Sequence, residues 1–193
     1  QHALVQADGS SDDLNSAFNI IKTTNTSNEI IYAKEYNYSN HKVGNSYAVH
    51  SMGSDAFQWK DANGNAIFHP GGDVLENIYL PCDMIVKSYD PADIRGHEKQ
   101  FFFKEYTDAT GVTHNLNNYG NWAWFDEKAL MEGHDGDYNM PMFRYSEILL
   151  IAAEGLARIG QESVALSYLN QVRRRAGLAD ETATGDALIQ SIL

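Results

Sequence analysis

The strongest hydrophobic pattern lies in the last third of the chain. Over residues 141–159, apolar side chains recur at helical spacing, with Pro141 at the start and Gly160 directly after the end. Proline at the beginning and glycine just past the end are typical of a helix, so this pattern predicts one over 141–159. The run 148–153 is apolar on nearly every side, so the helix must be covered from several directions.

A second helix is predicted over 162–176, where apolar residues again repeat at helical spacing and Gly177 follows as a cap. Gly160 leaves almost no linker between the two helices. They must therefore fold back on each other as an antiparallel hairpin. A third helix is predicted to begin near Asp186.

Residues before 141 follow a different pattern, with short β-rich runs between polar loops. Residues 29–36 are bounded by Asn and Ser clusters and predict a strand. Residues 57–60 and 66–68 predict a hairpin, because Asn63 and Gly64 suit a turn with positive φ.

A second hairpin is predicted where 101–106 lead into the turn-like segment 107–111, and 83–89 predict a short helix that stops before Pro91. We therefore expect an α+β chain in which a helical hairpin with the start of a third helix (141–193) accompanies a loop-rich portion (1–140). So much irregular chain is typical of binding loops, and we expect the loop-rich portion to hold the ligand site.

Charge and composition narrow the function. The chain has 26 acidic and 14 basic side chains, a net charge of −12, which argues against nucleic acid as a partner. Its single cysteine, Cys82, excludes an internal disulfide framework and a cysteine-rich zinc site. No apolar run is long enough to cross a membrane, and no leader is visible. Because the sequence ends inside the apolar run 187–193, we expect a piece of a longer protein.

The aromatic residues of 117–124 are the best candidate ligand site. In an extended chain, Trp122 and Trp124 would point to the same face, with amide and hydroxyl groups alongside. Stacking on one face of a sugar ring contributes about 2 kcal/mol, so several aromatic rings are needed for useful affinity. The candidate binding residues are Trp122, Trp124, Tyr119, Asn121 and Trp59.

These aromatic residues have an alternative interpretation as hydrophobic core. Large rings beside Phe125 pack readily in an interior, and Trp59 lies among other strand aromatics. A weaker candidate cluster is His41, Asn45 and Tyr47 in a polar loop.

Other residue patterns give little sign of catalysis or of a bound group. Residues 132–139 place oxygen ligands at alternate positions, but Met140 and Ser146 depart from a calcium loop, so a solvated loop is the better interpretation. No nucleophile elbow, phosphate loop or recognised metal spacing occurs, and we predict neither metal nor cofactor. A catalytic pair of carboxylates for glycoside cleavage remains an alternative, since the distance between two carboxylates cannot be derived from the sequence.

Charged residues of the helical part favour structural ion pairs. Arg144 and Glu147, and Glu154 and Arg158, lie at spacings that bring them together on one helix.

The helical segments resemble the SusD/RagB family. Residues 141–154 are similar to its signature helix, and 165–178 continue the match. Two weaker landmarks, within 28–32 and 89–95, stand upstream in the family's order.

That resemblance implies a mostly helical fold of tetratricopeptide hairpins with a loop-rich ligand-binding part. It also implies an outer-membrane lipoprotein, exposed at the bacterial cell surface, that captures glycans and hands them to a SusC-like TonB-dependent transporter. The family carries its lipid on a cysteine at the mature N-terminus, whereas Cys82 is internal. We therefore expect any lipid anchor to lie outside this sequence, and membrane attachment only through it.

The sequence thus favours non-catalytic binding of an oligosaccharide or polysaccharide. One alternative is a helical-repeat module that binds another protein and has no sugar site of its own. A third option is a glycoside-degrading enzyme.

Overall fold

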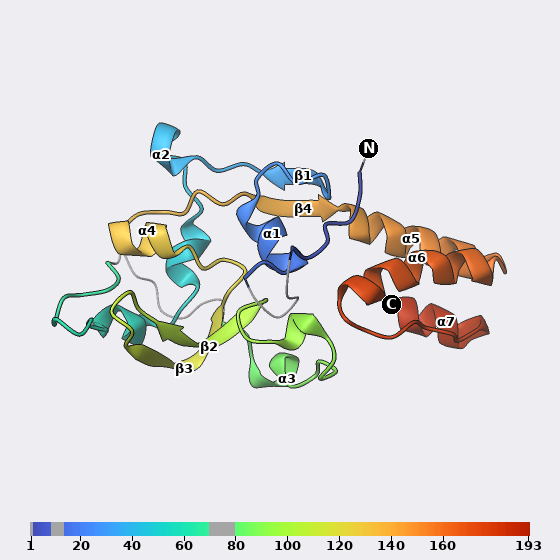
Figure 1. Cartoon of the computed structure of the whole chain (residues 1–193). Coiled ribbons are helices and arrows are strands. Elements are labelled where there is room, and N and C mark those ends of the chain that lie inside the picture. Colours follow the sequence, from blue (N-terminus) through green and yellow to red (C-terminus); the bar gives the residue numbers. More distant parts are fainter. Residues whose placement is uncertain (1, 9–13, 70–79) are drawn as a thin grey trace. The chain divides into compact units, whose positions relative to one another are not determined.

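The computed structural model describes residues 2–8, 14–69 and 80–193. The chain forms two compact units that interleave along the sequence (Figure 1). The helical unit comprises residues 1–33, 92–94 and 141–193, and the loop unit comprises 34–91 and 95–140. A unit boundary thus falls after residue 140, and residues 1–33 group with the helices.

Three helices dominate the helical unit: α5 (Tyr145–Arg158), α6 (Glu162–Arg175) and α7 (Gly185–Ile192). They confirm the three predicted helices, with one correction at the start. Residues predicted as the first turn instead form strand β4 (Met140–Arg144), which pairs with β1 (Ile30–Lys34). Proline at N1 of a helix and proline in an edge strand look alike in sequence, because neither position needs its missing N–H.

Small side chains let these helices approach closely. The turn between α5 and α6 uses Gly160 at φ +78°, a left-handed conformation that costs other residues energy. Alanines at the contact positions reduce the distance between the helix axes. The shared core consists of Ala153, Ala157, Ala165, Leu169 and Leu188.

A buried ion pair joins distant parts of the helical unit. Glu29, just before β1, is 0 % exposed, and its carboxylate accepts hydrogen bonds from Arg175 of α6 and from the backbone N–H of Val5. The Arg175 guanidinium lies over the ring of Phe18, 5.3 Å from its centroid. Phe18 belongs to helix α1 (Ala17–Thr23), which the hydrophobic pattern did not predict.

The described part of the loop unit contains a clear hairpin, in which β2 (Phe102–Thr107) pairs antiparallel with β3 (Thr113–Asn121). It confirms the second predicted hairpin. Its other elements are short: α2 (Tyr38–His41), α3 (Asp83–Val86), α4 (Glu127–Glu132), and the 3₁₀ turns η1 (Ser46–His50), η2 (Ser54–Gln58) and η3 (Ile94–Gly96), of which the last straddles the unit boundary.

The first predicted hairpin is correct only at its turn. Gly64 adopts φ +85°, and the Asp61 carboxylate accepts hydrogen bonds from the backbone of Asn63 and Asn65. A single bridge between Lys60 and Ala66 replaces the expected ladder. The residues before Trp59 form η2 instead of a strand, since they fold back onto the core.

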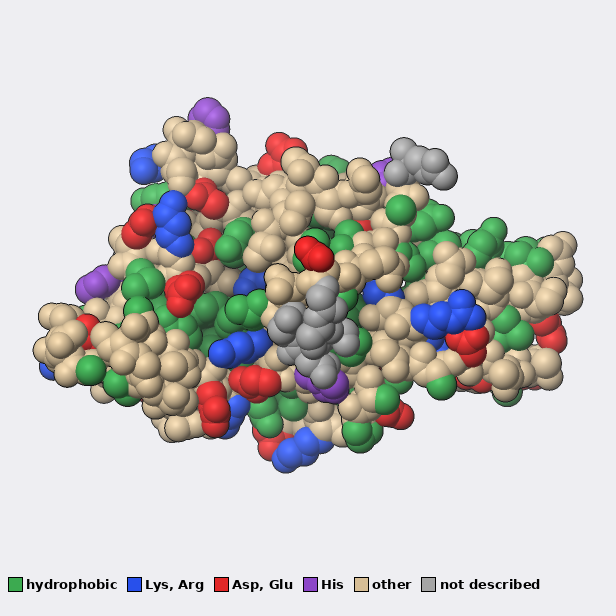
Figure 2. Space-filling model, viewed as in Figure 1, with side chains coloured by type: hydrophobic (Ala, Val, Ile, Leu, Met, Phe, Trp, Pro, Cys, Tyr) green, Lys and Arg blue, Asp and Glu red, His purple; other side chains and the backbone are tan. Residues whose placement is uncertain are grey.

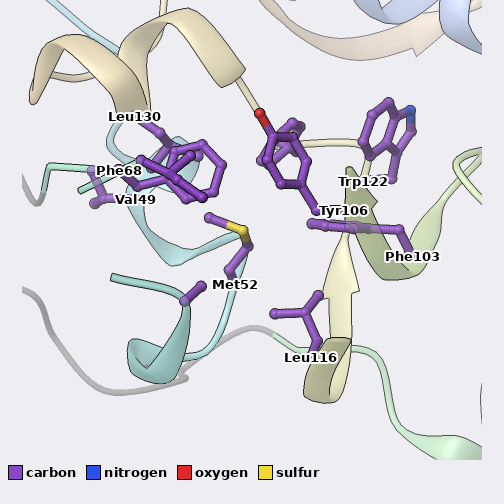
Figure 3. Close-up of a cluster of buried hydrophobic side chains, with 11 residues drawn as sticks. Val49, Met52, Phe68, Phe103, Tyr106, Leu116, Trp122 and Leu130 are labelled. Atoms are coloured by element: carbon purple, nitrogen blue, oxygen red, sulfur yellow. The ribbon is translucent and has the colours of Figure 1, made fainter. Parts of the chain in front are cut away.

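Aromatic side chains build the core of the loop unit (Figure 3). Phe103 is fully buried, and the ring of Phe125 packs 5.1 Å from it. On the neighbouring strand Gly120 faces the Phe103 ring, and a side chain there would overlap it. The core consists of Val49, Met52, Ala56, Ile67, Phe68, Phe103, Tyr106, Leu116, Trp122, Phe125 and Leu130.

Candidate functional site

The two tryptophans of 117–124 do not share one exposed face. After Asn121 the chain leaves the strand for a tight turn, in which the Trp124 N–H donates to the Asn121 carbonyl and Phe125 N–H to Trp122. Residues three apart in such a turn face the same way, so Trp122 and Phe125 both enter the core. Trp122 is 8 % exposed and lies among the buried side chains of the loop unit (Figure 3). Its ring stacks on Phe125 with centroids 5.0 Å apart. The expectation of an extended chain, with an exposed Trp122, is therefore wrong.

Trp124 keeps part of its ring exposed and meets Tyr47 of η1. The two rings stack with centroids 4.6 Å apart and planes 30° from parallel. Tyr47 is also partly exposed. Each ring covers one face of the other, so the outer ring faces are the apolar areas left to contact the C–H face of a sugar.

Local hydrogen bonds fix the position of this pair. Asn45 caps η1, with its Oδ1 accepting from the Tyr47 N–H at 3.1 Å, and its amide donates to the Tyr138 carbonyl at 3.1 Å. The end of β3 is held as well, since the Asn121 N–H donates to the Ser51 carbonyl at 2.7 Å. Asn45 and Tyr47, two of the three weaker sequence candidates, thus join Asn121 and Trp124 in one arrangement, whereas His41 is exposed on α2.

Trp59 packs mostly against its own unit. Its ring stacks on His114 at 4.9 Å and lies 6.2 Å from Tyr106. It remains partly exposed at the edge of the core. With one ring face against His114, less of Trp59 is left for a ligand.

Tyr119 lies on β3, where its ring meets Phe102 edge-on at 5.7 Å. The Lys104 ammonium stands 5.1 Å from the Tyr119 ring centroid. Tyr119 is partly exposed, and so is Asn121 at the end of the same strand.

A second stacked pair was missed from the sequence. Tyr38 of α2 stacks on His134 at 4.4 Å, and the Lys42 ammonium lies 4.6 Å from the Tyr38 ring centroid. Burial opposes protonation of His134, but hydrogen bonds to the Asp135 carbonyl and the Glu132 carboxylate outweigh it and raise its pKa above 6.5. The only sequence feature that could have indicated this pair is the occurrence of aromatic and cationic residues together at 38–42.

Two acidic residues of 132–139, Asp137 and Glu132, bond to protein groups. The Asp137 carboxylate accepts from the hydroxyl and N–H of Ser39, and Glu132 contacts His134 at 2.8 Å. Over residues 2–8, 14–69 and 80–193, no group of three or more His, Cys, Asp or Glu side chains is arranged to hold a metal ion.

Of the two ion pairs predicted from the sequence, one is confirmed and the other is wrong. Arg158 contacts Glu154 at 2.6 Å, which confirms that pair. Arg144 lies 3.9 Å from Glu29, and the predicted pairing with Glu147 is wrong. The reason is that Arg144 belongs to β4, before the helical geometry of α5 begins.

Two further observations concern the distribution of surface charge and the length of the helices. On the face shown in Figure 2, acidic and basic side chains are interspersed. In the part of the chain that the structure describes, every helix is too short or too polar to span a bilayer.

The chain thus combines a unit of packed antiparallel helices with a loop-rich unit that carries partly exposed aromatic pairs. A model of the SusD family matches residues 15–193, and the chain belongs to this family. The helical α+β fold expected from the resemblance is therefore confirmed. A comparison with curated proteins gives no match.

Solved structures give the same fold. A SusD superfamily protein from Parabacteroides distasonis has a TM-score of 0.66 at 24 % identity, covering 89 % of this chain and 36 % of that one. Surface glycan-binding protein A from Bacteroides uniformis has a TM-score of 0.62 at 20 % identity, covering 91 % and 36 %. The protein of that name from Bacteroides thetaiotaomicron, in complex with laminarihexaose, has a TM-score of 0.58 at 19 % identity, covering 96 % and 43 %. The chain thus spans well under half the length of these proteins.

Proposed function

We propose that this chain binds an oligosaccharide or polysaccharide without cleaving it, and that the Tyr47–Trp124 pair carries the contact. Family membership supports the proposal, as does the name of two similar structures, surface glycan-binding protein A. The observation that carries it is the stacked, partly exposed pair in the loop unit.

The energetics suit a binding platform made of several rings. One ring face contributes about 2 kcal/mol through apolar burial. Because Tyr47 and Trp124 each cover one face of the other, their two outer faces give at most about 4 kcal/mol to neighbouring units of one glycan, before binding costs. Millimolar affinity already requires about 4 kcal/mol after those costs, so contacts from further residues are needed. Tyr119 and Asn121 are proposed as flanking contacts, with Trp59 as an outer one.

The proposed role is capture and not catalysis. We further propose that the glycan passes to a SusC-like TonB-dependent transporter, and that the whole protein is a lipoprotein on the outer-membrane surface. Both statements rest on family membership.

Affinity electrophoresis against a panel of neutral and acidic polysaccharides tests glycan binding. We expect retardation of the wild-type chain and clearly less retardation of Tyr47→Ala. Tyr32→Ala is the matched control, because Tyr32 is an exposed tyrosine of the helical unit, and it should behave as wild type. Equal retardation of both variants would reject the assigned site. Product release from labelled oligosaccharides would reject the non-catalytic role.

A second candidate function, a protein-binding helical module without a sugar site, is favoured by exposed apolar side chains. Ile151 of α5 is 60 % exposed, and Ile148 and Phe143 are also exposed. Such a surface suits a partner helix. Self-association or partner binding that Ile151→Glu abolishes, together with no retardation on the whole panel, would favour this function.

A further inference from the structure

A buried carboxylate connects the two segments that carry the Tyr47–Trp124 pair. Asp126 lies two residues after Trp124 and is 5 % exposed. Its Oδ1 accepts a hydrogen bond from the Ala129 N–H at 3.2 Å, which caps α4, and its Oδ2 accepts from the Asp137 N–H at 3.2 Å. A buried carboxylate is costly unless such bonds compensate its lost hydration, so these two bonds hold it in place. The second bond ties residues 136–138 to the turn that carries Trp124.

Residues 136–138 also hold the other ring of the pair. Asn45 and Gly136 exchange two backbone hydrogen bonds, in which the Asn45 N–H donates at 2.7 Å and the Gly136 N–H at 3.0 Å. The Asn45 side chain donates to the Tyr138 carbonyl and accepts from the Tyr47 N–H, each at 3.1 Å. The segment is thus bonded to Asp126 directly and, through Asn45, to Tyr47.

Close packing makes this connection stiff. A Cβ atom at Gly136 would lie 2.9 Å from Asp126 Oδ2 and 3.2 Å from the Cβ of Ala48. Ala48 directly follows Tyr47 in η1 and is 1 % exposed. Because the contact leaves no room for a side chain at Gly136, a displacement of the carboxylate is transmitted to η1.

We propose that Asp126 is the positioning residue of the Tyr47–Trp124 pair. Its carboxylate fixes the distance and angle at which the two rings meet, and because it is buried it does not itself touch a ligand. A binding site works when neighbouring groups hold its side chains within about 0.5 Å of the productive geometry. The inference rests on the proposed function in taking this pair as the glycan contact.

Two substitutions separate the positioning role from the capping of α4. Asp126→Ser keeps a preferred N-cap residue, but its single, shorter oxygen cannot also reach the Asp137 N–H. Gly136→Ala removes no hydrogen-bonding group and inserts a methyl group where there is no room. Asp61→Ser is the matched control, because the Asp61 carboxylate also accepts from two backbone N–H groups, in a different turn of the same unit.

NMR chemical shifts of the Tyr47 ring protons measure the geometry directly, because the ring current of the stacked Trp124 displaces them. Comparison of wild type with Trp124→Ala defines that displacement. Asp126→Ser and Gly136→Ala should each lose at least half of it and bind a retained polysaccharide at least fivefold more weakly. Asp61→Ser should leave both the shifts and the affinity unchanged. A role confined to capping α4 predicts wild-type shifts in Asp126→Ser.

Wild-type Tyr47 shifts in both variants would overturn the inference, and so would an equal change in Asp61→Ser. Altered shifts with wild-type affinity would also overturn it, because the geometry of the pair would then not matter for binding. If Asp126→Ser does not fold, Gly136→Ala decides alone. If the wild type retains no polysaccharide while the shifts change as expected, the proposed glycan function fails and the positioning role of Asp126 stands.

Discussion

The two units form their hydrophobic cores from different kinds of side chain. The helical unit packs Ala153, Ala157 and Ala165 where its helices meet, so its core is thin and its stability depends on close helix contacts. The loop unit has little regular structure and fills its interior with large rings such as Phe103 and Trp122. A core of large rings leaves some aromatic residues at its edge, partly exposed. The binding surface proposed here is therefore a by-product of how the loop unit is packed.

The largest expected effect concerns the ion pair in the helical unit. Glu29→Ala leaves Arg175 buried without its carboxylate, and should lower the free energy of unfolding by about 3–5 kcal/mol. Glu154→Ala breaks an exposed pair and should cost less than about 1 kcal/mol. Denaturant unfolding measures both. Equal costs would mean that Glu29 does not hold this unit together.

Replacing one glycine in each unit by alanine tests the backbone conformation assigned to that glycine. Gly155 is exposed in the middle of α5 with open space around it, so Gly155→Ala should stabilise by about 0.5–1 kcal/mol. Gly64, in a loop-unit turn, has φ +85° and equally open space. Gly64→Ala should destabilise by about 1 kcal/mol, since only the backbone strain differs. Thermal unfolding of both variants measures the two signs, and the same sign for both would contradict the assignment.

A smaller effect is expected from pH in the loop unit. His134 has a raised pKa, so its stabilising contribution is complete below the unfolded pKa of about 6.5 and is lost as pH rises through the folded value. The groups around it are Tyr38, Glu132 and Asp137, with Lys42 beyond the Tyr38 ring. Unfolding free energies between about pH 6 and 8 should fall more in wild type than in His134→Gln. Parallel curves would exclude this contribution.

The secondary structure of the helical unit was predicted better from the sequence than that of the loop unit. Apolar repeats predicted α5, α6 and the start of α7, because a helix turns its periodicity directly into one buried face. The error at Pro141 arose because the pairing of β4 with β1 joins residues about 110 positions apart. No local pattern contains that information. The short helix α1 was missed for a similar reason, since its burial depends on distant partners.

For the candidate site, the sequence predicted the types of residue involved but not their arrangement. The density of aromatic residues around 117–124 drew attention to Trp124, but the alternation argument assumed a strand where the structure has a turn. That turn sends Trp122 inward and leaves Trp124 at the edge. The partner Tyr47 lies far away in sequence and reaches Trp124 through the hydrogen bonds of Asn45 and Ser51. Such tertiary contacts decide which ring is exposed.

The most direct measurement is a calorimetric titration of a retained glycan into wild type, Trp124→Ala and Trp122→Phe. Trp124→Ala should lose at least tenfold in affinity with an unfolding transition close to that of wild type. Trp122→Phe keeps an aromatic core side chain, and should lower stability while leaving affinity nearly unchanged. Wild-type affinity in Trp124→Ala would contradict the account, and so would a loss of affinity in Trp122→Phe alone.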